Sequence, residues 1–592
     1  MKQRQITPEK LRSLAKNKNL HIELRDKLND LALLLDNYSE WLDENKLQDA
    51  NCLLDFATDA IRSQSSIHDS RFTIQHLWLD GFAEMTPQEL DLLAAILPFC
   101  EDATLAFCLD ESAKKENSWL SIWNGIAKTF QQCRQRIKHL PDRKIQIEFL
   151  KRDSKKNRFT ESSALRELES RWQSSAGAPP AKLNAAETAA LQIIECTNPE
   201  AEAIFAAREI LKFVRAGNRF RDCAVIVRNL SNYDKALGRI FKRYQIPFFF
   251  DRPKPASHHP LAELTRSALR IVAFEWKNED WFAALKTGFI LPAPDETVKE
   301  LEEKIDSLEN AALEFGWNGK KWREFLPDES FERFRKRIIR PFEDFYGRLK
   351  LQFQINGIQL AKSLRELWNN LNVEKTLENW ETTNDNQPQI HFTVWKQMNL
   401  WADNLEIGFS KESLSLREWI PILETALGNL TVGVVPIKLD EVLIGAIDRA
   451  RNPELKFALV LGVNESVFPA MPSAPAILTE TDREELDISL APDLREQLSR
   501  ERFYGYLACT RASEKLTLTF SRADAEGTIL NPSPFIAQLQ QIFPSLEIEE
   551  FQNEISLTEI ESVNELIPLL VGDEATSIKS ENNQRLLTSS PT

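Results

Sequence analysis

The sequence predicts an α/β protein with parallel sheets and one large helical insertion. Short buried strands alternate with helices in two separate stretches of the chain, which is the pattern of parallel strands joined by crossover helices. Between about residues 260 and 427 the strand pattern disappears and helices take over. Over 592 residues, 42% are hydrophobic and 28% charged, so the composition is that of folded domains and excludes global disorder.

The first part of the chain predicts helices followed by a small sheet. Residues 1–70 repeat leucine at helical spacing. From residue 71 to 175 we expect an incomplete sheet domain, whose strands are FTIQHLWLD, ATLAFCLD and, near residue 147, KIQIEFL. Thr86 and Pro87 open the helix between the first two strands, as an N-cap and a first-turn proline.

The second part predicts a larger sheet interrupted by the insertion. We assign its domain to residues 188–259 and 428–545, with the insertion at 260–427. Its strands are LQIIECT, CAVIVR, IPFFFD, DEVLIGAI, LKFALVLGV and KLTLTFS, and a long helix spans about 493–510. We expect a linker at 174–187 and a C-terminal linker and tail at 546–592, polar and disordered after about residue 575.

Composition excludes several classes of protein. The formal charge is 74 − 89 = −15, which excludes a small basic nucleic-acid-coating protein but leaves room for a local basic channel. No two of the seven cysteines lie within three residues, and no HExxH motif occurs. We therefore expect free thiols, no metal site and no iron–sulfur cluster in this chain. No apolar run approaches the roughly 20 residues that span a bilayer, and the polar N-terminus lacks a signal sequence, so we expect a cytoplasmic protein without membrane contact.

Three residues are candidates for binding a nucleotide. Asp80 ends a buried strand, where an aspartate can hold magnesium, although Gly81 follows in place of a second carboxylate. Arg228 follows a buried strand, and Arg511 lies between a helix and a strand, where an arginine can reach phosphate oxygens. A turn aspartate and surface arginines in ion pairs are the ordinary alternatives. The phosphate loop GxxxxGK[ST] is absent from all 592 residues.

A basic helix in the insertion is the candidate DNA-binding element. Phe331 and Phe334 are interleaved with its cations, a combination that suits single-stranded DNA, while an amphipathic helix with a solvated charged face is the alternative. Pro341 is expected to end or kink this helix. The cations are Arg333, Arg335, Lys336, Arg337 and Arg340.

The order of these segments resembles a known family. The second sheet resembles the second motor domain of UvrD-type superfamily 1 helicases, with Arg228 at the place of the motif IV arginine. The segment SRERFYGYLACTRASEKLTLTFS is similar to motif VI, and Arg511 takes the place of its arginine finger. Within about residues 72–545, the strings LDGFAEMTPQE, IPFFFDRPKPASHHPL and TRASEKLTLTFSRADAEGTILNPSPFIAQL resemble the AddB (RexB) branch of AddAB-type ATP-dependent helicase–nucleases.

The resemblance implies two RecA-like domains, the first incomplete, with residues 1–70 as a 1B-like remainder and 260–427 as a 2B-like insertion. It implies a DNA-binding subunit that acts in double-strand break repair by homologous recombination, with DNA and an AddA-type helicase–nuclease subunit as partners. ATP and Mg²⁺ are implied as ligands, although the missing phosphate loop argues against them. The resemblance also implies that the chain begins after the Walker A position and stops before the nuclease domain.

This chain alone is therefore expected neither to hydrolyse ATP nor to cut DNA. Two alternatives stay open, an ATP-dependent DNA helicase in its own right and a degenerate helicase-fold scaffold. The main structural expectation is that Arg228 and Arg511 converge on one cleft beside the end of the Asp80 strand.

Overall fold

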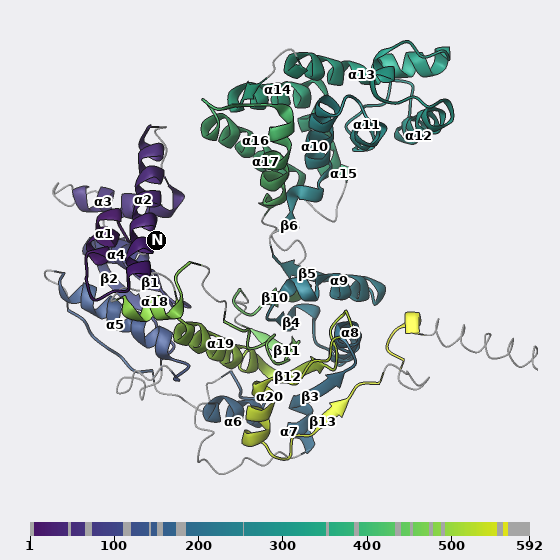
Figure 1. Cartoon of the computed structure of the whole chain (residues 1–592). Coiled ribbons are helices and arrows are strands. Elements are labelled where there is room, and N and C mark those ends of the chain that lie inside the picture. Colours follow the sequence, from purple (N-terminus) through teal and green to yellow (C-terminus); the bar gives the residue numbers. More distant parts are fainter. Residues whose placement is uncertain are drawn as a thin grey trace, which may run out of the picture. The chain divides into compact units, whose positions relative to one another are not determined.

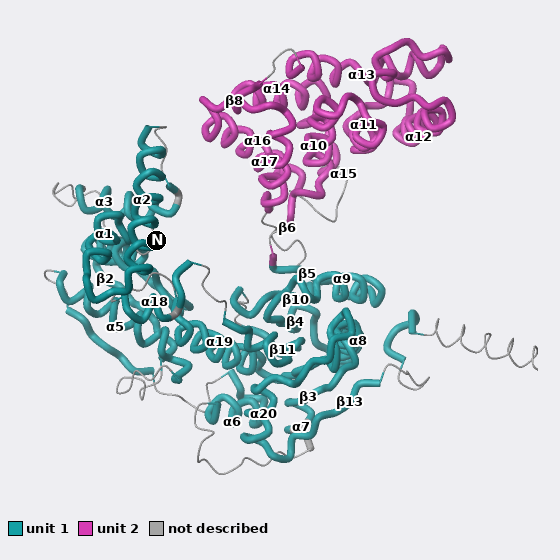
Figure 2. The backbone as a smooth tube through the Cα atoms, viewed as in Figure 1, with its two compact units in different colours: residues 1–251, 440–592 teal, residues 252–439 magenta. Residues whose placement is uncertain are grey.

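The computed structural model consists of two compact units (Figure 2). Unit 1 comprises residues 1–251 and 440–592, and unit 2 comprises residues 252–439, a range slightly wider than the expected insertion. The structure describes residues 5–44, 49–64, 74–109, 120–140, 144–150, 158–172, 185–252, 254–350, 354–383, 390–432, 440–449, 454–472, 477–486, 492–552 and 560–565. The expected linker falls mostly outside these residues, as does the chain beyond residue 565.

Unit 1 is built on a seven-stranded parallel sheet with the strand order β13-β3-β12-β11-β4-β10-β5 (Figure 1). The six strands predicted for this sheet are confirmed. They are β3 (Leu191–Cys196), β4 (Cys223–Val227), β5 (Phe248–Asp251), β10 (Val442–Ala446), β11 (Leu455–Leu461) and β12 (Ala512–Ser521). Because β10 pairs with β5 and β4, the chain leaves the sheet after β5 and returns beside the same strand, which is how unit 2 is accommodated.

Helices cover both faces of this sheet. Helices α8 (Pro199–Arg215) and α9 (Asp234–Arg243) share one buried cluster with alternate strand residues. Helices α19 (Leu494–Cys509) and α20 (Pro534–Ile542) share the other, together with α6 (Ser163–Arg171). The residues of β4 are buried throughout, as expected for a central parallel strand. A short helix, α7 (Ala185–Ala190), leads into β3, and α18 (Glu480–Glu485) precedes α19.

The N-terminal part of unit 1 has a sheet of two parallel strands. Strands β1 (Ile74–Leu79) and β2 (Cys100–Leu105) flank α4 (Pro87–Ile96), and Thr86 caps this helix through a reciprocal bond with Glu89. The expectation of a third strand near residue 147 is wrong, because residues 144–150 are exposed and pair with no strand. The other helices are α1 (Pro8–Ala15), α2 (Ile22–Glu44), α3 (Leu53–Gln64) and α5 (Asn124–Lys138).

Unit 2 is a helical domain around one large core rich in tryptophan. Its helices are α10 (Pro260–Ala273), α11 (Asn278–Leu285), α12 (Val298–Phe315), α13 (Glu329–Lys350), α14 (Gly357–Asn370), α15 (Val373–Thr383), α16 (Ile390–Gly408) and α17 (Leu416–Gly428). Two small antiparallel pairs join β6 (Lys254–Pro255) to β9 (Thr431–Val432) and β7 (Ile355–Asn356) to β8 (Ser413–Leu414).

Pro341 does not end α13, which continues to Lys350. A proline costs the helix one backbone hydrogen bond, and here Ile338, Ile339 and Phe342 are buried around it, so packing holds the helix together.

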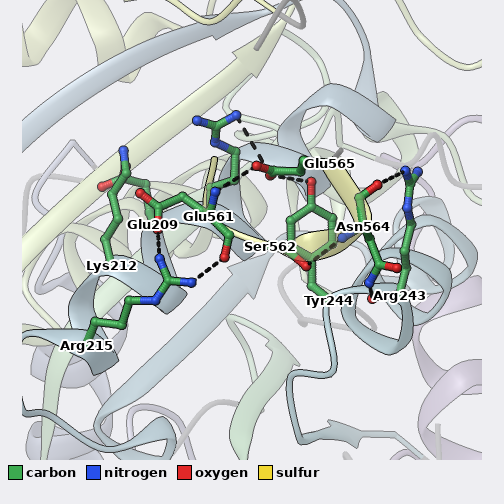
Figure 3. A network of polar contacts seen from close by, with 10 residues as sticks. Glu209, Lys212, Arg215, Arg243, Tyr244, Glu561, Ser562, Asn564 and Glu565 are labelled. Atoms are coloured by element: carbon green, nitrogen blue, oxygen red, sulfur yellow. Dashed lines mark hydrogen bonds and ion pairs between the residues drawn. The ribbon is translucent and has the colours of Figure 1, made fainter. Parts of the chain in front are cut away.

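The region expected to be a C-terminal linker contains ordered structure. Strand β13 (Ile548–Glu550) adds to the edge of the large sheet beside β3. Residues 560–565 then dock on α8 and α9 (Figure 3), where the Tyr244 hydroxyl donates to Glu565 at 2.7 Å and Arg243 donates to the Asn564 carbonyl at 3.1 Å. Glu565 is 2% exposed. The chain therefore continues as part of unit 1 well past residue 545.

Candidate functional site

The two candidate arginines lie at opposite ends of the strands of the large sheet. Arg228 follows β4 at its carboxyl end, whereas Arg511 precedes β12 at its amino end, and both strands run parallel to β11 between them. Val227 is level with Leu461, and Ala512 is level with Leu455. At about 3.3 Å per residue these levels are about 20 Å apart. The prediction that both arginines line one cleft is therefore wrong.

Arg228 is bound by an acidic partner. Its Nε donates to both carboxylate oxygens of Glu501 at 2.9 Å, and its Nη2 forms a further bond to the same group. These hydrogen bonds raise the pKa of Arg228 above its ordinary value. The Tyr504 ring lies 5.2 Å from the guanidinium carbon, and the backbone N–H of Ala470 also donates to Glu501. The ordinary alternative, an arginine held in an ion pair, describes this geometry.

Asp80 lies on the N-terminal sheet, exposed at the end of β1. Its Oδ1 accepts from the backbone N–H of Gly81 at 2.7 Å, and the chain bends at Gly81, which has φ +75°. The loop that follows reaches α19, where Glu84 pairs with Arg500. The structure thus connects the Asp80 loop with the helix that carries Glu501.

Arg511 has a different environment. Its Nε is buried with no hydrogen-bond partner among the described residues, and burial together with the nearby charge of Arg158 lowers its pKa. Arg158 in turn donates to the backbone carbonyl of Thr510. Arg158 does not stand out in the sequence, because it is one of several cations in the polar segment KRDSKKNR, far from Arg511 in the chain.

The carboxyl edge of the large sheet is filled by the protein's own polar side chains. Glu202 is fully buried and accepts from the hydroxyls of Tyr233, Thr519 and Ser521, and from the backbone N–H of Gly462 at 3.1 Å. Burial and the Glu202 charge raise the pKa of Tyr233. Ligands of open α/β sheets usually bind at this edge, and here its buried carboxylate is already bonded to four donors from the protein itself.

Asn464, which follows β11 at the same edge, is also engaged internally. It is 1% exposed, and its Nδ2 donates to the carbonyls of Ser521 at 2.8 Å and Asn531 at 3.1 Å. In the described ranges no group of three or more acidic, histidine or cysteine side chains could hold a metal ion. Glu202 and Asn464, the polar side chains buried at this edge, are both engaged with the protein itself.

The basic helix α13 contains two kinds of cation. Arg335 is buried and binds Glu332 through Nε at 2.8 Å and Nη2 at 2.7 Å, which lowers the pKa of Glu332 to about 2. Arg337 pairs with Glu296 at 2.7 Å. Arg335 is therefore unavailable to DNA, contrary to expectation, and the charge of Arg337 is neutralised.

The other three cations of the predicted basic run, Arg333, Lys336 and Arg340, are exposed. Within the described residues Arg333 and Arg340 have no acidic partner, and Lys336 lies 3.4 Å from Glu332. Their spacing of three and four residues places them on one helix face, which we call the α13 stripe. Phe331 and Phe334 pack against the core of unit 2 and are not free to stack on bases.

Known proteins support the resemblance on which these candidates rest. A family model described as "ADDB, N-terminal" matches residues 1–169. Over 561 residues the chain is 31% identical to the B subunit of the ATP-dependent helicase/deoxyribonuclease of Moorella thermoacetica. This match covers 90% of this chain and 47% of the relative. Residues 1–169 thus match the AddB family model, and about nine tenths of the chain is similar to an AddB subunit.

Other AddB relatives match over similar lengths. The corresponding protein of Natranaerobius thermophilus is 29% identical over 613 residues, covering 93% of this chain and 50% of the relative. That of Heliobacterium modesticaldum is 31% identical over 559 residues, covering 88% and 44%. This chain thus spans about half the length of the curated AddB relatives it matches. Among the described helices, none combines the length and the apolar character that crossing a bilayer demands.

Proposed function

We propose that this chain is the helicase-like, DNA-guiding part of an AddB-type subunit, acting with an AddA-type partner on broken DNA ends in recombinational repair. The observation that carries the proposal is the similarity, over about nine tenths of the chain, to proteins named as the B subunit of an ATP-dependent helicase/deoxyribonuclease. ATP turnover and DNA cleavage are assigned to other polypeptide, because the phosphate loop is absent from these 592 residues.

DNA contact is assigned to the α13 stripe of unit 2. Arg333, Lys336 and Arg340 are exposed and share a helix face, so their charges are available to phosphates. The negative net charge of the chain does not oppose this assignment, because phosphate binding depends on local charge.

The proposed function does not depend on nucleotide binding by this chain, although two of the three candidate residues stay candidates for it. Of the two candidate arginines, Arg511 is the one that lacks an acidic partner within the described residues, and it stays a candidate for a phosphate with Arg158 beside it. Asp80 stays a candidate for Mg²⁺. Arg228 is assigned to stabilising the fold through Glu501.

Reconstitution tests the proposal. The chain is mixed with a purified AddA-type subunit and a blunt DNA duplex, and size-exclusion chromatography and DNA end degradation are measured. We expect the chain to co-elute with the partner and DNA, and degradation to require ATP and the partner. Failure to associate with either the partner or DNA would refute the proposed function.

A further inference from the structure

An exposed phenylalanine stands beside the α13 stripe on a rigid base. Phe325 is 68% exposed, whereas Trp322 and Leu326 on either side of it are fully buried. The backbone N–H of Leu326 donates to Glu332 at 3.0 Å, which ties this loop to α13. The ring is therefore presented to solvent by a segment whose flanks are anchored in the core.

One cation of the α13 stripe lies next to this ring. The ammonium group of Lys336 lies 5.8 Å from the Phe325 ring centroid, which places the ring beside the α13 stripe. Arg333 and Arg340 are seven residues apart, or about 10 Å along the helix axis. An aromatic surface next to a row of exposed cations is the combination that binds a single nucleic-acid strand, because bases stack on the ring while phosphates meet the cations.

The surrounding charges set the length of strand that fits. Glu329 and Asp344 lie four residues beyond the two ends of the stripe on the same helix face, and both are exposed. Their negative charges bound the α13 stripe at both ends along this helix face. The site is therefore matched to a short stretch of strand.

We propose that Phe325 is a base-stacking residue for single-stranded DNA, with the α13 stripe holding the phosphates on either side. The inference rests on the proposed function, since it names the contact through which unit 2 would meet DNA. A paired base in a duplex does not expose its face, so the Phe325 contribution is specific to single strands.

The test compares Phe325→Leu with a matched control. Phe392 is 59% exposed on α16 of the same unit, so Phe392→Leu removes an exposed ring without touching the stripe. The full chain is titrated with a fluorescent oligothymidine, the same strand with an abasic site at each position in turn, and a duplex of equal length, over a series of salt concentrations. Circular dichroism verifies that both variants fold.

We expect Phe325→Leu to weaken binding of the single strand by about 5- to 30-fold, in the range of one lost stacking contact. Its salt dependence and its duplex binding should be unchanged, because no charge is removed. One abasic position should weaken binding to the wild type but not to Phe325→Leu. Arg333→Gln should instead reduce the logarithmic salt slope for the single strand by about 0.7.

Equal single-strand affinities of Phe325→Leu, Phe392→Leu and the wild type would overturn the assignment of Phe325 while leaving the proposed function intact. The same holds if Phe325→Leu weakens single-strand and duplex binding equally. If the wild type binds neither DNA, both the inference and the proposed function fail.

Discussion

Replacing Arg228 by methionine should destabilise unit 1 by about 3 kcal/mol. The substitution leaves the Glu501 carboxylate, whose side chain is 7% exposed, with the backbone N–H of Ala470 as its remaining hydrogen-bond donor in the described structure. Removing one partner of a buried ion pair costs about 3–5 kcal/mol. The Arg228 side chain is 22% exposed, so the lower end of that range applies.

The double variant Arg228→Met/Glu501→Met tests whether the loss of stability comes from the unpaired Glu501 carboxylate. With both charges gone, no unpaired carboxylate is buried, and the main loss is the acceptor of the Ala470 N–H, at about 1 kcal/mol. The double variant should therefore be more stable than Arg228→Met by about 2 kcal/mol.

Thiol labelling in increasing urea measures this free energy for unit 1 alone. All seven cysteines lie in unit 1 and none in residues 252–439, and Cys223 and Cys509 are buried. The fraction of each thiol labelled in a short pulse reports how much of unit 1 is unfolded. A loss below about 1 kcal/mol in Arg228→Met, or a double variant as unstable as the single, would refute a stabilising role for Arg228.

Three further predictions concern stability. Burial and the neighbouring His391 lower the pKa of His259 to about 4, below the unfolded value of about 6.5, so unit 2 should lose stability as pH falls from about 6.5 towards 4. His259→Asn, which keeps an N-cap oxygen, should reduce this dependence in tryptophan-fluorescence melts, while His391, whose pKa burial also lowers, keeps part of it; an unchanged dependence would contradict the reasoning. Gly462→Ala would place a Cβ 2.7 Å from the Tyr233 hydroxyl, whereas Gly527→Ala, at a similar φ, would meet open space. Gly462→Ala should therefore lower the unfolding free energy of unit 1, measured by thiol labelling, by at least about 1 kcal/mol more than Gly527→Ala. Equal losses would contradict the close packing of Tyr233 at the carboxyl edge of the sheet. Glu565→Ala should lower the same free energy by about 2 kcal/mol, because it removes the buried partner of Tyr244, and a neutral effect would show that residues 560–565 contribute nothing to unit 1.

The large sheet could be predicted from sequence because its strands are short, apolar and bounded by helix signals. Six of its strands follow from this pattern alone. The strand near residue 147 was mispredicted, because alternation of apolar and polar residues is satisfied locally whether or not a neighbouring strand exists to pair with. Strand β13 was missed because three exposed residues carry no such pattern.

The candidate site was harder to predict, because it depends on which residues meet in space. Arg228 and Arg511 each end an element, but the sequence does not say at which edge of the sheet each lies until the strand directions are known. Likewise, Arg335 and Arg333 look alike in a basic run, and only the packing of Glu332 shows that the first is buried. Ion-pair partners such as Glu501 are distant in the chain and carry no local signal.

Equilibrium binding of the whole chain to a forked DNA with a single-stranded tail, with ATP hydrolysis followed in the same samples, tests the account most directly. The account predicts binding at low salt that weakens steeply as salt rises, with no hydrolysis by the chain alone. Absence of binding at low salt, or hydrolysis that DNA stimulates without any partner subunit, would contradict it.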